Sequence, residues 1–190
     1  MKKSISCVLM AAGVSKRFGE NKLKENINGQ TLIEHSLSII PKEKFNKVIV
    51  VSGQEDILQN AERMGFQSVL NIEPEKGLSH TIKLGLSKCN DDDAVMFLVS
   101  DQPYLKKETV AKLVDEYMKK PEFIFALKSD TRRGNPCIFP KKFYDELYAL
   151  SGDVGGSEVI RRNENELVLI KTDETELIDI DTKNDLLKTK

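Results

Sequence analysis

The chain has 190 residues, of which 39% are hydrophobic and 31% charged, a composition that excludes the disordered and fibrous classes. Its 29 Lys and Arg residues nearly balance its 30 Asp and Glu residues, and the net charge of −1 argues against nucleic acid or a membrane surface as a partner. No stretch approaches the roughly 20 apolar residues of a membrane span. We therefore predict a single globular domain over residues 1–190.

Apolar runs rich in β-branched residues recur along the chain and predict buried strands. These runs are Ser6–Met10, Lys47–Ser52, Ser68–Asn71, Ala94–Ser100, Phe123–Leu127, Cys137–Pro140 and Leu167–Ile170. Between them, apolar residues spaced three and four apart predict helices. The helical stretches are Thr31–Ile40, Gln54–Met64, Ser79–Lys88, Lys107–Lys119, Lys141–Ala149, Val154–Arg162 and Lys183–Leu187.

This alternation of strands and helices predicts the fold class. Right-handed βαβ units build a mainly parallel sheet with helices on both faces, so we expect an α/β, Rossmann-like fold. In such folds ligands bind at the carboxyl ends of the strands. The polar segment from Lys128 to Pro140 departs from the alternation and predicts a β-hairpin-like insertion, and the acidic run Asp91–Asp93 predicts a solvated turn.

The cysteines and histidines offer no cluster for metal or redox chemistry. Cys7, Cys89 and Cys137 are widely separated and lack C-x-x-C spacing, so we interpret them as reduced core thiols of a cytoplasmic protein. His35 and His80 each stand alone within a predicted helix, and we expect them to be solvated or packed.

A loop of small and basic residues follows the first predicted strand. Residues 11–19 read AAGVSKRFG and residues 21–23 read NKL. Small residues let the backbone pass close to a ligand, and exposed N–H groups with Arg17 and Lys22 suit a polyphosphate. The spacing matches neither the P-loop nor the G-x-G-x-x-G dinucleotide fingerprint. Taken alone, A-A-G is equally consistent with a tight strand-to-helix connection.

The order A-A-G-x-S-x-R-F-G-x-x-K resembles the signature loop of the MobA-like nucleotidyltransferases. That resemblance implies a nucleotide-diphospho-sugar transferase-like fold and a loop that wraps an NTP. The positions it implies for nucleotide binding are Ala11, Ala12, Gly13, Ser15, Arg17 and Lys22. It also implies a catalytic role for the Arg17 and Lys22 side chains, which would stabilise charge on the triphosphate.

Two aspartates lie where a metal could be held. Asp101 ends the apolar run from Ala94, and Asp181 precedes the last predicted helix. Mg²⁺ prefers one or two carboxylates together with substrate phosphates and water. Each aspartate has another reading, since Asp is favoured in turns before proline and at helix N-caps. The resemblance places both at metal-binding positions, gives Asp101 a catalytic role, and favours Asp181 over Asp179 because the ligand directly precedes a threonine.

Further motifs resemble the molybdenum cofactor cytidylyltransferases within that family. They are Gly77-Leu78-Ser79, Gly134-Asn135-Pro136 and Gly152-Asp153-Val154-Gly155-Gly156. The related guanylyltransferases usually carry A-G-G where this chain has A-A-G, so the resemblance implies that Ala12 favours CTP. The implied reaction transfers CMP from CTP to the phosphate of molybdopterin-type cofactor, releases pyrophosphate and uses Mg²⁺. A molybdenum hydroxylase is the implied recipient of the product.

Three further positions have both a site role and a purely structural one. Asn135 stands where the family commonly has histidine, and it either binds the acceptor or belongs to a turn before Pro136. Ser79 either contacts the nucleotide or caps a helix, and Gly53 either approaches the base or ends a strand.

The implied chemistry is an in-line displacement at the α-phosphorus, for which an ionised acceptor phosphate needs no strong base. Charge stabilisation by metal and basic side chains should then dominate. Two alternatives remain open. One is the same chemistry on another acceptor, including guanylyl transfer to molybdenum cofactor or transfer to a sugar or polyol phosphate. The other is a non-catalytic carrier of the cofactor.

Overall fold

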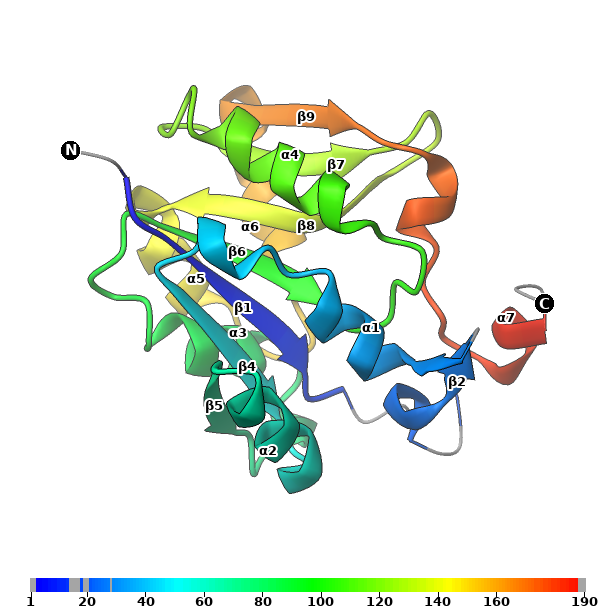
Figure 1. Ribbon diagram of the computed structural model, residues 1–190. Coiled ribbons are helices and arrows are strands. Elements are labelled where there is room, and N and C mark those ends of the chain that lie inside the picture. The colour runs from blue at the N-terminus through cyan, green and yellow to red at the C-terminus, as the bar shows by residue number, and fades with distance from the viewer. Residues whose placement is uncertain (1–2, 14–17, 19–20, 28, 188–190) are drawn as a thin grey trace.

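A seven-stranded sheet forms the centre of the computed structural model, which describes residues 3–13, 18, 21–27 and 29–187 (Figure 1). The strand order is β5-β4-β1-β6-β8-β7-β9, and within this sheet only β8 runs antiparallel to its neighbours. The strands are β1 (Ile5–Ala11), β4 (Lys47–Ser52), β5 (Gln67–Leu70), β6 (Ala94–Val99), β7 (Ile124–Lys128), β8 (Arg133–Pro140) and β9 (Leu167–Lys171).

Helices cover both faces of the sheet, because alternate residues of each central strand point to opposite sides. On β1, Cys7 and Leu9 join the core beneath one set of helices, and Val8 and Met10 join the core beneath the other. The first set is α1 (Leu32–Ser38), α2 (Glu55–Arg63) and α4 (Lys107–Tyr117), and the second is α3 (Leu78–Leu86), α5 (Tyr144–Ala149) and α6 (Gly156–Arg162). The predicted α/β fold with a mainly parallel sheet is confirmed.

Short elements connect these layers. They are β2 (Asn26–Ile27), β3 (Gln30–Thr31), the 3-10 turns η1 (Lys22–Lys24), η2 (Lys42–Lys44), η3 (Pro74–Lys76), η4 (Lys141–Phe143), η5 (Glu164–Glu166) and η6 (Glu174–Leu177), and the final helix α7 (Lys183–Leu187). Thr31 caps α1 reciprocally with Glu34, so this helix begins one residue later than predicted. The stretch predicted as one helix from Lys141 begins instead with η4 before α5.

The segment 128–140 forms the predicted hairpin, but it is not an insertion outside the sheet. β8 pairs antiparallel with both β7 and β6 and therefore lies within the sheet. The strand begins at Arg133, earlier than its apolar run indicates, and Cys137, Ile138 and Phe139 are buried on the two faces. Its apolar second half pairs on both edges, and its polar first half pairs with β7 through Gly134 and Arg133.

The strand order places the site. β4 and β5 lie on one side of β1, and β6 returns to the other side, so the chain reverses direction across the sheet between β1 and β6. Loops that leave neighbouring strands at such a switch point diverge and open a crevice at the carboxyl ends. The carboxyl ends of β1 and β6 are therefore where this fold should bind a ligand.

The other end of the same strands holds a buried carboxylate, and the predicted solvated turn is wrong for Asp92. Asp92 is 1% exposed and accepts hydrogen bonds from the Ser6 hydroxyl at 2.7 Å and the Asn46 amide at 2.6 Å. The Lys47 ammonium lies 3.4 Å from the same carboxylate. Hydrogen bonds and an ion pair from two other segments of the chain compensate the cost of burying this carboxylate. An acidic run in the sequence does not reveal such partners.

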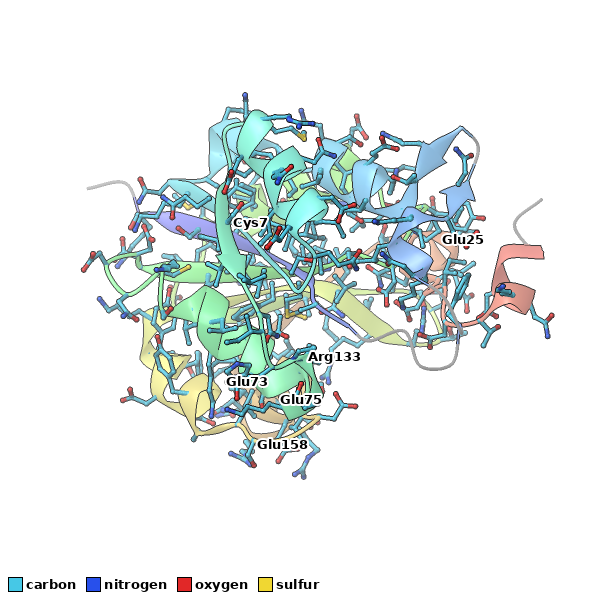
Figure 2. All side chains as sticks on the ribbon, turned by 90° about the horizontal axis from the view of Figure 1, so that it is seen from below. Cys7, Glu25, Glu73, Glu75, Arg133 and Glu158 are labelled. Atoms are coloured by element: carbon cyan, nitrogen blue, oxygen red, sulfur yellow. The ribbon has the colours of Figure 1, made fainter. Side chains whose placement is uncertain are left out.

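The cysteines belong to the core, as predicted. All three are buried free thiols, and Cys7 on β1 lies in the interior of the molecule (Figure 2). Burial raises the pKa of Cys89 and of Cys137 to about 12 in each case, so both are protonated at neutral pH. No helix in the described part of the chain is long and apolar enough to cross a membrane.

Candidate active site

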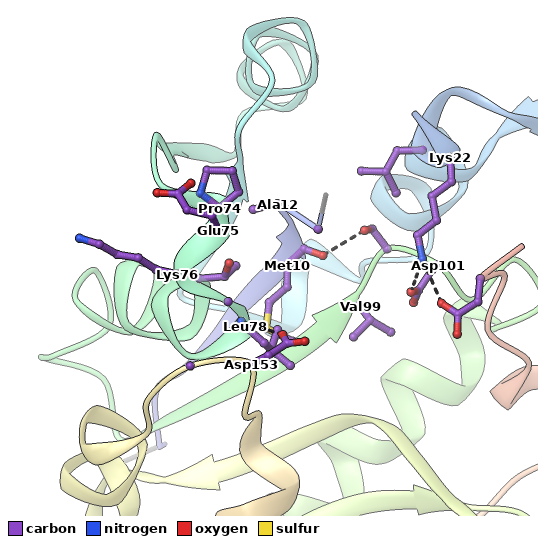
Figure 3. Close-up of a pocket in the computed structure, with 17 residues that line it drawn as sticks. Met10, Ala12, Lys22, Pro74, Glu75, Lys76, Leu78, Val99, Asp101 and Asp153 are labelled. Atoms are coloured by element: carbon purple, nitrogen blue, oxygen red, sulfur yellow. Dashed lines mark hydrogen bonds and ion pairs between the residues drawn. The ribbon is translucent and has the colours of Figure 1, made fainter. Parts of the chain in front are cut away.

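A cavity of about 650 Å³ opens at the predicted crevice (Figure 3). One wall comes from the end of β1 and the 3-10 turn η1, and the floor comes from the end of β6. The opposite wall comes from η3, the start of α3 and the loop after α5. The segments that line the cavity are residues 10 and 12–13, 22–23, 74–78 and 81, 99–101, 152–153 and 181.

Lys22 is the centre of a compact charged cluster at one side of this cavity. Its ammonium donates to the Asp101 carboxylate at 2.8 Å and lies 3.5 Å from the Asp181 carboxylate. It also donates to the Ile180 carbonyl oxygen at 3.0 Å. The Lys22 side chain is 12% exposed, so water screens this cluster less than it would a surface pair. One cation thus joins segments of the chain that are far apart in sequence.

Local structure fixes the lysine and the first aspartate. The Asn21 side chain caps η1 by accepting from the Leu23 backbone N–H at 3.3 Å, and Leu23 itself is buried. Lys22 therefore extends from a short turn that is held at both its cap and its apolar side chain. At the end of β6, the Ser100 hydroxyl donates to the Met10 carbonyl oxygen at 3.0 Å, which ties the residue before Asp101 to β1.

The second aspartate is carried by the segment that precedes α7. Ile180 is fully buried against Phe18 and Leu32, and its backbone N–H donates to the Asp101 carbonyl oxygen at 2.9 Å. Thr182 caps α7, since its hydroxyl accepts from the Asp185 backbone N–H at 3.3 Å. The cap of α7 is therefore the Thr182 side chain, and the alternative in which the Asp181 side chain caps this helix does not apply.

A close backbone approach forms the opposite wall. Gly77 has a φ of +85°, and a Cβ there would lie 2.6 Å from the backbone of Gly152. Hydrogen bonds join the same segments: the Ser79 N–H donates to the Gly152 carbonyl oxygen at 3.2 Å, and the Leu78 N–H donates to Asp153 at 3.2 Å. Glycine is required at position 77 by both sterics and backbone angle.

The donor set suits a divalent cation held jointly with a substrate. Within the described residues, no group of three or more His, Cys, Asp or Glu side chains could hold a metal ion. Asp101 and Asp181 nevertheless face one cation, the Lys22 ammonium, within 3.5 Å. Two carboxylates around a positive charge, with the remaining positions left to phosphates and water, match the preference of Mg²⁺. The residues present fit that ion.

Comparison with known proteins decides the family. Residues 7–167 match the MobA-like NTP transferase domain, which is most of the chain. The protein belongs to the MobA-like NTP transferase family.

Curated relatives that the chain resembles have different names. It is 29% identical over 191 residues to the purine catabolism protein PucB of Bacillus subtilis (strain 168), covering 92% of this chain and 90% of PucB. It is 28% identical over 173 residues to the probable molybdenum cofactor guanylyltransferase of Aquifex aeolicus (strain VF5), covering 84% of this chain and 81% of that protein. The chain spans only 31% of the bifunctional protein GlmU of Clostridioides difficile (strain 630), at 24% identity.

Solved structures share the fold of this MobA-like protein. Rv0371c from Mycobacterium tuberculosis H37Rv superposes with a TM-score of 0.82 at 19% identity, covering 99% of this chain and 98% of that one. A second structure of Rv0371c, in complex with manganese, gives a TM-score of 0.78 at 20% identity and covers 98% and 97% of the two chains. At this identity the likeness shows the fold alone.

The structure brings part of the predicted site together. The predicted residues that line the cavity are Ala12, Gly13, Lys22, Asp101 and Asp181. They come from the ends of β1 and β6, from η1 and from the segment before α7. Ser15 and Arg17 lie outside the described residues. The roles assigned to the predicted site residues remain predictions, whereas the common location of the five that line the cavity is observed.

Other predicted site residues do not line this cavity. Ala11 is buried as the last residue of β1, and Gly53 follows β4, where a Cβ would lie 3.2 Å from the Asn71 carbonyl oxygen. Ser79 is 3% exposed within the first turn of α3, whose N-cap is Gly77 without a side-chain bond. Asn135 is half-buried in β8, with its side-chain oxygen near the Cys137 thiol.

Sequence reasoning missed the charged residues of the wall opposite Lys22. Glu75, Lys76 and Asp153 lie there (Figure 3), and Lys76 forms an ion pair with Glu73 at 2.6 Å. The two glutamates lie close to the ribbon of α3 in the view of Figure 2. Asp153 belongs to a motif noted in the sequence but was given no role of its own. Glu75 and Lys76 precede the motif at Gly77, and their short charged stretch does not differ in sequence from a solvated turn.

Sequence reasoning also set Asp179 aside as the less suitable carboxylate, and the structure gives it a separate position. Asp179 is half-buried and does not line the cavity. Burial and the neighbouring charge of Asp101 raise the pKa of Asp179 above its usual range, partly offset by the Gln102 amide and the Arg132 guanidinium. Its partners Gln102 and Arg132 were not predicted as part of the site.

Proposed function

We propose that this protein, as one domain over residues 1–190, transfers a nucleoside monophosphate from an NTP to the phosphate of a small acceptor with Mg²⁺ as its metal. One observation carries the proposal: Lys22, Asp101 and Asp181 converge at 2.8 and 3.5 Å in a cavity at the switch point of the sheet. This arrangement combines a cation for the triphosphate with two carboxylates for a metal.

Asp101 and Asp181 would hold Mg²⁺ at the edge of the cavity. When bound, the ion supplies charge stabilisation to the phosphates of the nucleotide. Lys22 leaves its contacts with the carboxylates and donates instead to the triphosphate, while the backbone at Ala12 and Gly13 lies beside the nucleotide. An oxygen of the acceptor phosphate, already ionised, attacks the α-phosphorus of the NTP in line without a general base. As that P–O bond forms, the bond between the α- and β-phosphates breaks and pyrophosphate leaves with the electron pair. Positioning and electrostatics therefore account for the chemistry without a catalytic triad.

The finer proposal names CTP as donor and molybdopterin-type molybdenum cofactor as acceptor, with a molybdenum hydroxylase as the enzyme that receives the product. Its support is the A-A-G loop and the motifs that resemble the cytidylyltransferases, together with the position of Ala12 on the cavity wall. The second candidate is guanylyl transfer to the same acceptor. The relative from Aquifex aeolicus favours it, because that protein is named a guanylyltransferase.

One experiment separates these candidates. Purified protein is incubated with Mg²⁺, molybdopterin-type cofactor and each of the four NTPs in turn, and pyrophosphate is measured together with the mass of the product. We expect pyrophosphate and a CMP adduct with CTP. A GMP adduct with GTP would replace the cytidylyl proposal with the guanylyl one. The assay is repeated with sugar and polyol phosphates as acceptors. If no NTP releases pyrophosphate with any of these acceptors, the non-catalytic carrier alternative is favoured.

A further inference from the structure

Asp179 lies beside the carboxylates of the site, yet donors occupy both of its oxygen atoms. The buried Gln102 amide donates to one oxygen at 2.9 Å, and the Arg132 guanidinium donates to the other at 3.1 Å. The donors come from different parts of the fold, the end of β6 and the turn between β7 and β8. A third carboxylate in this region is thereby kept paired with groups other than the Lys22 ammonium.

These contacts join the two segments that carry Asp101 and Asp181. Gln102 directly follows Asp101, and Asp179 is two residues before Asp181. Between them, the Ile180 N–H donates to the Asp101 carbonyl oxygen at 2.9 Å, so a backbone bond and the Gln102–Asp179 bond connect the same pair of segments. The connection crosses 77 residues of sequence. The buried Ile180 and the Lys22 cluster also hold the segment of Asp181 in place.

The Gln102 side chain has a feature that packing alone does not favour. It is 2% exposed, and its Oε1 is the one fully buried side-chain nitrogen or oxygen that lacks a hydrogen-bond partner in the described part of the chain. Leaving a buried carbonyl oxygen without a donor costs stability, so an apolar residue would suit this position better if it served only the core. The directed bond from Gln102 Nε2 to Asp179 accounts for an amide here.

Arg132 is held by its own turn. The Arg132 backbone N–H donates to the Ser129 hydroxyl at 3.2 Å, and the Ser129 N–H donates to the Arg132 carbonyl oxygen at 2.8 Å. These bonds fix the backbone of the turn between β7 and β8, from which the guanidinium reaches Asp179. A bond from an ordered turn costs less side-chain and backbone entropy than one from a mobile loop.

We propose that Gln102, Asp179 and Arg132 form a positioning bridge that sets the spacing of Asp101 and Asp181 for a divalent cation. The inference rests on the proposed function, because it takes those two aspartates as the metal ligands. None of the three residues is a ligand itself. Residues that hydrogen-bond to metal ligands without binding the metal orient those ligands, and removing them typically lowers metal affinity or activity about 10- to 100-fold.

The test compares Gln102→Leu, Arg132→Ala and Arg132→Lys with wild type. Lys171→Ala is the matched control, because it removes another exposed cation near the same hairpin, one that pairs with Asp130 at 2.6 Å. Mn²⁺ binding to the protein in the presence of CTP is measured by electron paramagnetic resonance, and the Mg²⁺ concentration for half-maximal rate is measured by pyrophosphate release. Circular dichroism melting reports folding.

We expect Mn²⁺ binding to weaken about tenfold or more in Gln102→Leu and less in Arg132→Ala, with partial recovery in Arg132→Lys. The half-saturating Mg²⁺ concentration should rise in parallel while kcat at saturating Mg²⁺ stays within about twofold of wild type. Lys171→Ala should match wild type in both. If Gln102→Leu does not fold, the exposed Arg132 variants carry the test.

Mn²⁺ affinity within twofold of wild type in every folded bridge variant would overturn the inference. Asp101→Ala in the same binding experiment separates this failure from failure of the proposed function. If Asp101→Ala loses Mn²⁺ while the bridge variants keep it, only the bridge is wrong. If Asp101→Ala binds Mn²⁺ as wild type does, Asp101 is not a ligand, and the metal site of the proposed function fails together with the bridge.

Discussion

Replacing Lys22 by methionine should change metal binding and catalysis in opposite directions. The substitution keeps an unbranched side chain of similar length and removes its charge. In the structure the ammonium contacts both proposed metal ligands, at 2.8 and 3.5 Å, so a divalent cation must displace it before binding there. The variant removes that competitor. It also removes the charge that is proposed to act on the triphosphate once nucleotide is present.

The magnitude follows from the distances. At an effective dielectric constant of about 20, the two ion pairs have Coulomb energies of about 5 to 6 kcal/mol each, most of which offsets the cost of removing the ions from water. If about 1.4 kcal/mol remains as competition, nucleotide-free Mn²⁺ binding strengthens about tenfold in the variant. The loss of electrostatic stabilisation should lower kcat/KM about 10- to 1,000-fold.

Two assays check this prediction. Calorimetry measures Mn²⁺ binding without nucleotide, and pyrophosphate release measures kcat/KM. Lys24→Met is the control, because Lys24 lies in the same turn but pairs with Asp56, and both of those side chains are more than half exposed. An unchanged or weaker Mn²⁺ affinity in Lys22→Met would refute the competition, and an unchanged kcat/KM would remove Lys22 from the chemistry.

Three further predictions concern single side chains. Ala12→Gly should reduce the ratio of kcat/KM for CTP to that for GTP by no more than about tenfold, since one methyl contributes about 1 kcal/mol. An unchanged ratio would show that Ala12 does not contribute to base selection. Gly77→Ala should destabilise the fold by about 2 kcal/mol or more and raise KM for the NTP, because φ at this position is +85° and the new Cβ would lie 2.6 Å from the backbone of Gly152. A melting curve and a KM equal to those of wild type would contradict this. Asp92→Ala should lower the free energy of unfolding, measured in urea, by about 3 kcal/mol without lowering kcat, because it leaves buried donors unpaired. A loss under about 1 kcal/mol would show that the fold does not need the carboxylate.

The sheet and its helices could be predicted because the pattern that encodes them is local. A strand covered on both faces is a continuous apolar run, as in Ala94–Val99. In each covering helix the apolar residues recur at spacings of three and four residues. β8 shows the limit of this reasoning. Its first half contains Arg133, Asn135 and Pro136, which do not indicate a strand, and pairing with β7 extends it to Arg133.

Within the site, the sequence indicated residues that end strands or resemble a known loop, and it missed those whose role depends on a distant partner. Asp101 lies two residues after the end of a buried strand and is found at the cavity. Gln102 is the next residue but becomes notable only through Asp179, 77 positions away. Asp92 is similar, because its burial is compensated by Ser6 and Asn46 from other segments. Such contacts are set by the fold and not by local sequence.

The most direct test of the account is nucleotidyl transfer by wild type and by Asp101→Ala under the same conditions. Purified enzyme, Mg²⁺, CTP and molybdopterin-type cofactor are mixed, and pyrophosphate is followed together with the CMP adduct by mass spectrometry. We expect equal amounts of both products from wild type, dependence on Mg²⁺, and a loss of nearly all turnover in a variant that melts as wild type does. Wild-type turnover in folded Asp101→Ala at saturating Mg²⁺ would contradict the proposed metal site and with it the central claim.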